Sequence, residues 1–588
     1  MTETFYRRLP ALASLRTYSW RDARGDLVGG LSVAAVAIPQ AMAYALIVGL
    51  PPEVGLYTAI VMTTVGALLD SSKQLINGPT NAISIALLGI VGTVESPEGK
   101  VQAAVLAALL IGLIQLAIAF ARLGDLTRYI SHSVIVGFTA GASLLLVFDQ
   151  LKNLLGQRAV GDLHAHFLVR VWRSLTEGGD VHLPTLALGL GSIVGVLALR
   201  WAKRWVGWPL FPEFLVVVIA AAGATAWFDL GAAGVKVVGA IPASLPSFRL
   251  PSLDATMVRE MAPSALALGL LGLLEAISMA KGISAVTRQK LDLNQQCFSE
   301  GFANLAGAFF GCMPGSGSLT RSAINHQAGA RTQWSGVVSA AAVAITMLFF
   351  APFAQHIPRP ALAGLLIVTA TRMVNIPDLR YHMRASNFDK AIVLTTAISA
   401  FAISIEFCIL IGVVMSFLLA VPRASSLHLT EFIVTDEGQV HERLPEDKAC
   451  DRILIFGLEG ELFFGSAVSL DQHLESIEAR IVPDTRVLIL RMKRTRAPDA
   501  VGLTALEGAV TRIQTRGVRV IMCGVRREMF EAMERGGLIQ KQEREDIFLE
   551  TAVRQTSTQQ AIARAYAVLD ERCERCPRGV NPQLHYVV

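Results

Sequence analysis

The chain has 588 residues and 17% charged residues, where ordinary globular domains have about 25%, and its mean hydropathy is +0.49. This composition excludes a protein that is water-soluble along its whole length. The net charge of +5 is small for this length, and no basic tract with interleaved aromatic residues indicates nucleic-acid binding. The seven cysteines all lie between Cys297 and Cys576, which favours a reduced compartment over a secreted disulfide framework.

The first 26 residues are polar and lack the apolar core and cleavage site of a signal peptide. An arginine-rich flank of this kind predicts a cytoplasmic N-terminal segment, 1–26, by the positive-inside rule. The arginines are Arg7, Arg8, Arg16, Arg21 and Arg24.

Apolar segments recur from about residue 27 to about 422, with short polar breaks. A spanning helix needs roughly 20 apolar residues, and hydrocarbon offers the backbone no other hydrogen-bond partner. The sequence therefore predicts a polytopic α-helical membrane protein. The clearest predicted spans are 27–48, 53–69, 101–122, 130–149, 185–201, 209–228, 262–280, 333–354, 359–374, 388–405 and 407–422.

Two shorter segments, 78–91 and 314–325, each open on a glycine and proline break. Short, interrupted segments at corresponding places in two halves indicate the central binding site of a transporter. The halves are 27–228 and 262–422, separated by the polar stretch 229–261. If 296–312 is also a span, each half has about seven, and an odd number makes the two repeats inverted. The even total predicts a cytoplasmic C-terminus.

After Arg423, charged residues appear throughout, and β-rich runs alternate with amphipathic helical runs. This pattern predicts a small α/β domain over 423–572, without a phosphate-binding glycine loop. The predicted strands are 452–464, 486–492 and 518–525, and the predicted helices are 466–480, 501–516, 526–536 and 556–569.

The remaining residues, 573–588, are predicted to be a C-terminal tail. Cys573 and Cys576 have metal-ligand spacing, but a zinc site needs two more ligands and only His585 is near. We therefore predict no metal site and no cofactor.

The two short segments predict where an anion would bind. A helix that begins inside the membrane directs N–H groups and the positive end of its dipole at the space before it. Arg321 adds a full positive charge, since an arginine at this depth normally faces a polar cavity or a partner. The alternative is that Arg321 pairs with a carboxylate or caps carbonyl groups near a membrane interface. The candidate binding residues in the two helical turns are Thr80, Asn81, Ala82, Ser318, Leu319, Thr320 and Arg321.

Glu275 lies deep in the apolar span 262–280. Removal from water favours the protonated form of a carboxyl group, so we predict that Glu275 is the proton-coupling residue. The alternative is an ion pair with Lys281 or Arg321. Glu300, near a predicted helix end, is interpreted as interfacial.

In the first span, Pro39 opens the hydrogen-bond ladder, and Gln40 and Tyr44 follow on one helix face. We predict that these two residues contact the anion. Packing between helices is the alternative interpretation of such a pair.

Three motifs resemble one family. The segment IPQAMAYALIVGLPPEVGLYT (38–58) closely resembles the signature of the sulfate permease (SulP) family, and GPTNAISI resembles the start of its third span. The segment NQQCFSEGFANLAGAFFGCMPGSGSLTRSAINHQAGARTQWSG (294–336) resembles its ninth and tenth spans, and the C-terminal domain resembles a STAS domain. The similarity covers nearly the whole chain.

The resemblance implies a homodimeric carrier of two inverted seven-span repeats, with a core domain that moves against a gate domain. The residues at substrate-contacting positions of the family are Gln40, Tyr44, Thr80, Thr320 and Arg321. Glu275 occupies the position of a glutamate found in proton-coupled members.

Two departures from the family pattern stand out. The tenth span reads SLTRSA where relatives often have SxSRTA, so Thr320 supplies the hydroxyl. The STAS turn that accepts phosphate in related bacterial proteins reads Asp499, Ala500, Val501, Gly502, without a hydroxyl. A scaffold or partner-binding role for the STAS domain follows.

The sequence thus predicts proton-coupled sulfate uptake by alternating access in the inner (plasma) membrane, without catalytic residues. Sodium-coupled bicarbonate uptake and proton-coupled C4-dicarboxylate uptake remain alternatives, as does an anion exchanger. An anion channel would need a continuous water path, and a membrane-anchored sensor would carry no flux. A nucleobase symporter could share the fold, but the basic tenth span suits an anion better.

Overall fold

The structure is a computed structural model. It describes residues 9–92, 94–125, 131–158, 160, 166–207, 211–434, 440–447, 450–540, 544–551 and 556–569. Arg7, Arg8, Cys573, Cys576 and His585 lie outside the described residues. The chain divides into two compact units, Met1–Ser416 and Phe417–Val588.

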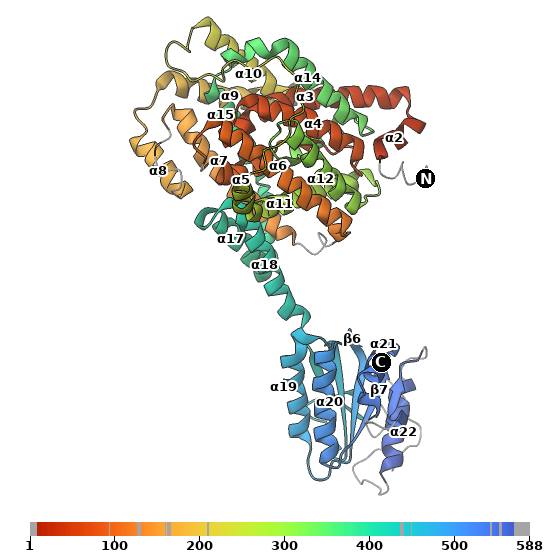
Figure 1. The fold of residues 1–588 in the computed structure, drawn as a ribbon. Helices are drawn as coiled ribbons and strands as arrows, with labels where there is room; N and C mark the ends of the chain where they lie inside the picture. Colours follow the sequence, from red (N-terminus) through yellow and green to blue (C-terminus); the bar gives the residue numbers. More distant parts are fainter. Residues whose placement is uncertain are drawn as a thin grey trace. The chain divides into compact units, whose positions relative to one another are not determined.

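The first unit is a bundle of helices (Figure 1). Its longest N-terminal helix begins after Ser19, whose side chain accepts a hydrogen bond from the Asp22 N–H, and ends at Gly49 with a φ of 79°. The helices up to residue 227 are α2 (Pro10–Ser14), α3 (Trp20–Val48), α4 (Pro52–Leu69), α5 (Asn81–Val91), α6 (Pro97–Phe120), α7 (His132–Leu155), α8 (Phe167–Glu177), α9 (Leu183–Val206) and α10 (Glu213–Trp227).

The second half of the bundle contains α11 (Ala255–Thr287), α12 (Leu293–Phe309), α13 (Leu319–Gln327), α14 (Trp334–Phe350), α15 (Arg359–Met373), α16 (Ile376–Ala385), α17 (Asn387–Ala402) and α18 (Ile405–Ala424). Two short strands, β1 (Asn77–Gly78) and β2 (Ser316–Gly317), precede α5 and α13. Among the described residues, nine helices are long and apolar enough to cross a membrane.

Helices from the two halves pack closely against each other, and α6 with α12 is the most extensive pair. A Cβ on Gly112 of α6 would lie 2.6 Å from the Leu305 nitrogen, and one on Gly301 of α12 would lie 2.7 Å from the Leu116 nitrogen. Only glycine permits this backbone approach, which is typical of helix packing in membranes. The two halves therefore form one bundle.

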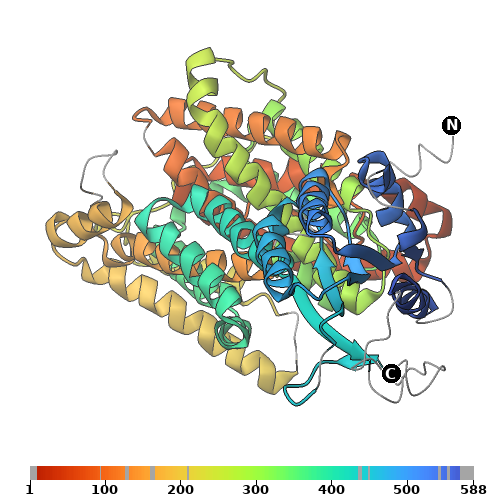
Figure 2. The ribbon, with the colours of Figure 1, turned by 90° about the horizontal axis from the view of Figure 1, so that it is seen from below.

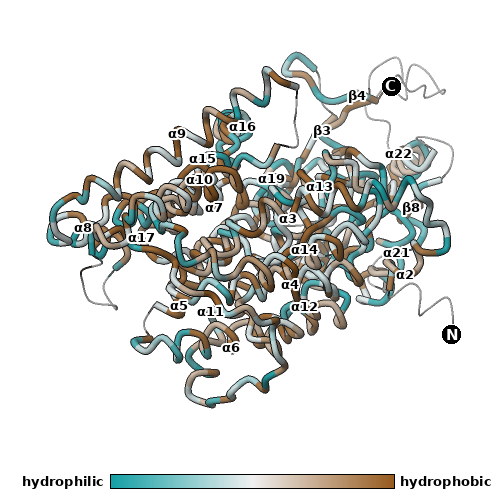
Figure 3. Tube along the Cα trace, turned by 90° about the horizontal axis from the view of Figure 1, so that it is seen from above, coloured by the Kyte–Doolittle hydropathy of each residue, from teal (hydrophilic) through white to brown (hydrophobic). Residues whose placement is uncertain are grey.

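Helix α9 lies at the edge of the bundle, where Figure 2 shows it as a long yellow helix. Only 22% of its apolar window is buried, and Val194 and Leu197 on it are exposed. Figure 3 shows hydrophobic residues, in brown, along much of the helices of the first unit. Apolar side chains on an outer face of this kind are suited to lipid or to a second subunit.

The second unit is an α/β domain with a six-stranded sheet in the order β4-β3-β5-β6-β7-β8. Strands β5 to β8 are parallel, and β3 is antiparallel to β4 and β5. The strands are β3 (His428–Val434), β4 (Val440–Glu442), β5 (Ile453–Glu461), β6 (Val487–Arg496), β7 (Arg519–Val525) and β8 (Ile547–Leu549). The helices are α19 (Ala467–Arg480), α20 (Ala500–Thr515), α21 (Arg527–Arg535) and α22 (Thr556–Val568).

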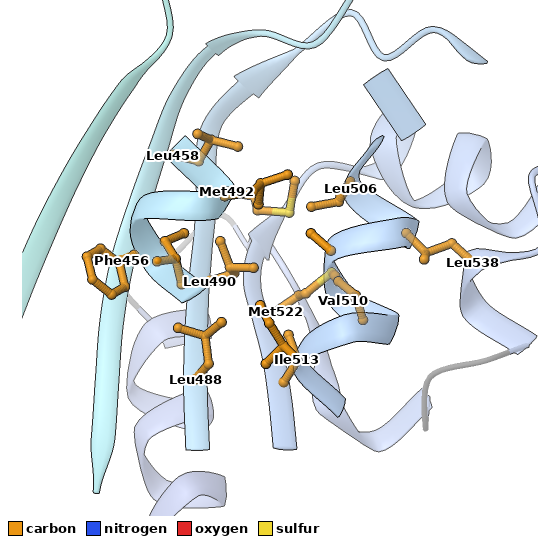
Figure 4. Packing of buried hydrophobic residues seen from close by; sticks show 14 of the residues in the cluster. Phe456, Leu458, Leu488, Leu490, Met492, Leu506, Val510, Ile513, Met522 and Leu538 are labelled. Atoms are coloured by element: carbon orange, nitrogen blue, oxygen red, sulfur yellow. The ribbon is translucent and has the colours of Figure 1, made fainter. Parts of the chain in front are cut away.

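Successive side chains of β6 pack alternately on the two faces of this sheet. Leu488 and Leu490 pack with Leu506 and Val510 of α20 (Figure 4). Ile489, between them in the sequence, packs on the opposite face with residues of α22. Successive strand residues point to opposite faces, so a strand that is apolar throughout lies between two helical layers.

The predicted fold class is confirmed: a polytopic α-helical membrane unit precedes a small α/β domain. The inverted relation of the two repeats stays a prediction. Two amphipathic helices, α8 and α16, were not predicted from the sequence, because they are too short and polar to be spans. Strands β3, β4 and β8 were not predicted either, and the last two have three residues each.

Candidate functional site

The strands β1 and β2 bring the starts of two helices together. They pair antiparallel, with Asn77 opposite Gly317 and Gly78 opposite Ser316. Antiparallel strands leave their ladder in opposite directions, so α5 and α13 extend away from each other and their N-termini meet beside it. The two segments chosen for their glycine and proline breaks are thus adjacent in space.

Each of these helices has a capping side chain at its start. The Thr80 hydroxyl accepts a hydrogen bond from the Ile83 N–H at 3.3 Å. The Ser318 hydroxyl accepts one from the Arg321 N–H at 3.5 Å. The first N–H groups of a helix have no acceptor within the helix, and they add to the positive end of its dipole. Both helix starts therefore favour negative charge.

A cavity of about 90 Å³ lies at these two N-termini. Helices α3, α7, α11, α15 and α18 supply the rest of its wall. Eight of the ten predicted site residues line it: Tyr44, Thr80, Asn81, Ala82, Glu275, Ser318, Leu319 and Thr320.

Glu275 reaches the cavity from the middle of α11. Its carboxylate Oε2 accepts a hydrogen bond from the Thr80 hydroxyl at 3.1 Å. The same hydroxyl oxygen caps α5. A titratable group in the cavity wall is therefore in direct contact with the start of a helix that faces the cavity.

Arg321 lies behind the cavity wall. Its side chain is buried, with 1% of the residue exposed, and its Nη2 donates a hydrogen bond to the Pro79 carbonyl oxygen at 2.8 Å. A Cβ at position 78 would come within 2.8 Å of the Arg321 Nη1, which explains why Gly78, with a φ of 144°, stands there. The carbonyl contact is the one that the alternative interpretation anticipated. The guanidinium still places a positive charge beside the start of α5.

Gln40 lines a neighbouring cavity of about 290 Å³, whereas Tyr44, one turn further along α3, lines the cavity at the two helix starts. Within the described part of the chain, neither polar atom of its buried side-chain amide has a hydrogen-bond partner. Thr320 lines both cavities, so the two cavities adjoin the start of α13. The prediction that both side chains contact one bound anion stays a prediction.

Thr369 and Arg372 of α15 line both cavities and were not predicted from the sequence. The sequence does contain a signal for Arg372, because this arginine lies in the last turn of an otherwise apolar segment. Asn81 contacts the sulfur of Met373 through its side-chain amide, which was not predicted either. This contact joins the start of α5 to the end of α15.

The interpretation of Glu300 as interfacial is wrong. Glu300 is fully buried near the middle of α12. The polar segment around it looked like a helix end, but α12 continues through it. Its polar residues face inward, where Gln296 and Ser299 donate hydrogen bonds to the buried Asp70 carboxylate at 2.7 and 2.6 Å.

A bundle of apolar helices with a polar cavity between two helix N-termini defines a multi-pass membrane transport protein. Residues 24–396 match the model of the sulfate permease family, and residues 445–552 match that of the STAS domain. The chain belongs to the sulfate permease family, and the resemblance inferred from its motifs is confirmed.

Several relatives support this assignment. The chain is 31% identical over 448 residues to a sodium-independent sulfate anion transporter of Bos taurus, covering 71% of this chain and 73% of that protein. It is 28% identical over 552 residues to the chloroplastic sulfate transporter 4.1 of Arabidopsis thaliana, covering 90% and 79%.

Two solved structures show the same fold. The murine anion transporter Slc26a9 in the inward-facing state has a TM-score of 0.86 at 20% identity, covering 96% of this chain and 95% of that chain. The transmembrane domain of the cyanobacterial bicarbonate transporter BicA has a TM-score of 0.58 at 23% identity, covering 68% and 98%.

Proposed function

We propose that this chain takes up sulfate or a related oxyanion together with protons, as a secondary active transporter. One arrangement carries the proposal: the starts of α5 and α13 face a small cavity, and Glu275 in its wall contacts Thr80. The sulfate transporters among the relatives point to the same substrate.

Electrostatics favours a doubly charged anion. Each helix N-terminus is equivalent to roughly +0.5 charge, so two of them and the Arg321 guanidinium supply roughly two positive charges. Arg372 also lines the cavity, but it is exposed and its charge is screened more strongly. A sulfate dianion would balance the buried positive charge.

Cavity size favours a compact inorganic anion. The volume of about 90 Å³ is enough for several water molecules, since each needs roughly 10–15 Å³ of such space. An anion of a few heavy atoms, such as sulfate or bicarbonate, suits a space of this size. Between these two, the charge argument favours sulfate.

In this proposal, the Glu275 carboxyl group carries the transported proton. An ionised carboxylate beside the cavity repels an incoming anion, by about 3 kcal/mol for unit charges roughly 5 Å apart at an effective dielectric constant of about 20. Protonation removes this repulsion. It also removes the need for the Thr80 hydroxyl to donate to Glu275, so that this donor can turn to the anion. Proton and anion would therefore bind together.

In this proposal, 27–228 and 262–422 are the two inverted repeats, and their relative movement gives alternating access. Two copies form a homodimer in the inner (plasma) membrane, with the segment 1–26, the STAS domain 423–572 and the tail 573–588 in the cytoplasm. The STAS domain is a scaffold or binds a cytoplasmic protein, because Ala500 and Val501 leave its turn without a phosphate-accepting hydroxyl.

The test is uptake of labelled sulfate into proteoliposomes of purified protein, with and without an imposed inward proton gradient. Unlabelled bicarbonate, fumarate and succinate serve as competitors, and protein-free liposomes as the control. We expect gradient-stimulated accumulation that competing sulfate abolishes and succinate does not. Uptake that responds to a sodium gradient alone, or single-channel currents in planar bilayers, would contradict the proposal.

A further inference from the structure

Two histidines and an aspartate converge outside the anion cavity. His132 is the first residue of α7, and Asp378 and His382 lie one turn apart on α16. The Nε2 of His132 lies 3.2 Å from Oδ2 of Asp378, and the Nε2 of His382 lies 3.5 Å from Oδ1. One ligand atom from each residue lies within 4.8 Å of the other two. Both imidazoles thus direct Nε2 at one carboxylate.

A second layer of contacts orients His382. The Ser133 hydroxyl donates a hydrogen bond to Asp389 Oδ1 at 2.6 Å, and it lies 3.1 Å from Nδ1 of His382. A hydroxyl has one proton, so with that proton on Asp389 its oxygen accepts from the Nδ1–H of His382. The lone pair of His382 is then on Nε2, which faces Asp378. Supporting hydrogen bonds of this kind fix the tautomer of metal-binding histidines.

This arrangement leaves a lone pair of His382 directed at a carboxylate oxygen. Two acceptors that face each other repel unless a metal ion, or a second ring proton on Nε2, lies between them. We propose that His132, Asp378 and His382 bind a divalent transition-metal ion of the zinc type. Imidazole nitrogen and carboxylate oxygen are ordinary zinc ligands, and three protein ligands leave a fourth position open to water. The side chains of His132, Asp378 and His382 are 57%, 30% and 14% exposed, so the site is open to solvent.

Sequence spacing could not have indicated this site, since His132 and Asp378 are 246 positions apart. The position of this cluster matters because α7 lines the anion cavity and α16 directly follows α15, which also lines it. On α7, Ile135 in the next turn lines the cavity. At the other side, Arg372 and Met373 line it at the end of α15, directly before α16 begins at Ile376. A bound ion would fasten these two parts of the cavity wall to each other.

The consequence for transport rests on the proposed function. If α7 and the α15–α16 segment move relative to each other during transport, zinc should slow sulfate uptake. Binding itself can be measured without any transport, so the two ideas fail separately.

The test is zinc titration of the purified full-length protein by isothermal calorimetry, with the visible absorption of Co²⁺ as a probe of tetrahedral ligation. We expect one site per chain, with affinity reduced at least tenfold in Asp378→Asn and in His382→Gln. Two controls should keep the site: His428→Gln, an exposed histidine on β3, and the double change Cys573→Ser with Cys576→Ser. Unchanged melting of the metal-free variants would show that they fold.

Three outcomes would overturn the assignment. The first is the absence of saturable zinc binding to the unmodified protein, which would leave an ordinary pair of ionic contacts between histidine and aspartate. The second is unchanged affinity in both ligand variants. The third is loss of binding in the double cysteine variant, which would move the site to the C-terminal tail.

Discussion

Thr80 and Glu275 are 195 positions apart in the chain, and a hydrogen bond of 3.1 Å joins the hydroxyl of one to the carboxylate of the other. Thr80 also caps α5 by accepting from the Ile83 N–H. One hydroxyl therefore connects the group proposed to hold the proton with a helix start proposed to hold the anion. The coupling between proton and anion is expected to pass through this contact.

The first prediction concerns Glu275→Gln. The amide has nearly the same size as the carboxyl group and its oxygen can still accept from Thr80, but it cannot change charge. We expect sulfate to bind and equilibrate across the membrane while a proton gradient no longer drives accumulation. Uptake into proteoliposomes at several external pH values measures both properties.

A matched control exists in the same bundle. Glu300 is also a fully buried glutamate, but it does not line the anion cavity. Glu300→Gln should keep the response to the proton gradient. If Glu275→Gln retains the full pH dependence, or if both variants lose it equally, Glu275 is not the specific coupling residue.

The second prediction concerns Arg321. At an effective dielectric constant of about 20, opposite unit charges roughly 7–10 Å apart attract each other by about 1.7–2.4 kcal/mol, which corresponds to roughly a 15-fold to 50-fold change in affinity at 1.4 kcal/mol per factor of ten. Arg321→Ala should weaken sulfate binding by at least that lower factor. Arg321→Lys keeps the charge but loses the planar fork, so an intermediate loss is expected. Equilibrium binding to the detergent-purified protein is the measurement.

Arg321 also holds the Pro79 carbonyl, so folding must be checked by size-exclusion chromatography and thermal melting. Arg331→Ala serves as the control, because Arg331 is exposed and pairs with Asp22 at 3.5 Å. An Arg321→Ala protein that melts normally and binds sulfate with unchanged affinity would rule out the electrostatic role.

Most helices of the membrane unit could be predicted from the sequence, because a membrane span is recognised from the length of its apolar segment. The predicted span 101–122 corresponds to α6, and 359–374 corresponds to α15. Even the short α5 was visible, since the break at Gly78 and Pro79 interrupts an apolar segment. Amphipathic α16 has no such signal, because its polar residues resemble those of a loop.

The cavity was predictable in its two helix starts and less so in its remaining wall. The sequence indicates Thr80 and Ser318 as N-cap residues, because each is a hydroxyl residue next to a glycine and proline break. That Arg372 lines the cavity, and that Gln40 and Tyr44 line different cavities, depends on how α3, α13 and α15 pack. The rotation of a helix about its axis is not encoded in a single segment. The burial of Glu300 was missed for the same reason, since its partners lie on other helices.

The third prediction compares two buried carboxyl groups, that of Asp70 directly after α4 and that of Glu300 in α12. Asp70 accepts hydrogen bonds from Asn77 at 3.2 Å, from Gln296 at 2.7 Å and from Ser299 at 2.6 Å. In the described part of the chain, neither carboxyl oxygen of Glu300 has a hydrogen-bond partner. Asp70→Asn should therefore destabilise the protein by at least about 1.5–3 kcal/mol, the contribution of one such charged hydrogen bond.

Glu300→Gln should cost much less, because an amide replaces a carboxyl group that has no donor to lose and whose ionised form is unfavourable when buried. Thermal melting of the two variants in one detergent compares them directly. Equal destabilisation would mean that Glu300 has strong partners of its own, and a greater loss in Glu300→Gln would reverse the assignment.

The last prediction concerns Cys523 in the STAS domain. Burial raises the pKa of the Cys523 thiol to about 12, while its side chain lies in the apolar layer under α22. The thiolate is the reactive form, so the folded domain should resist alkylation at pH 8 to about 9, where an unfolded cysteine with a pKa near 8.5 reacts readily.

The sign of the stability effect follows from the raised pKa. The folded state binds this proton more tightly than the unfolded state, so its contribution is complete below the unfolded pKa and is lost as pH rises toward 12. A full-length variant whose only cysteine is Cys523 can be treated with a maleimide over a urea series at pH 8. Labelling should rise only with unfolding of the STAS domain, as followed by loss of its circular dichroism. Rapid labelling without urea would show that the layer between α22 and the sheet opens in the native protein.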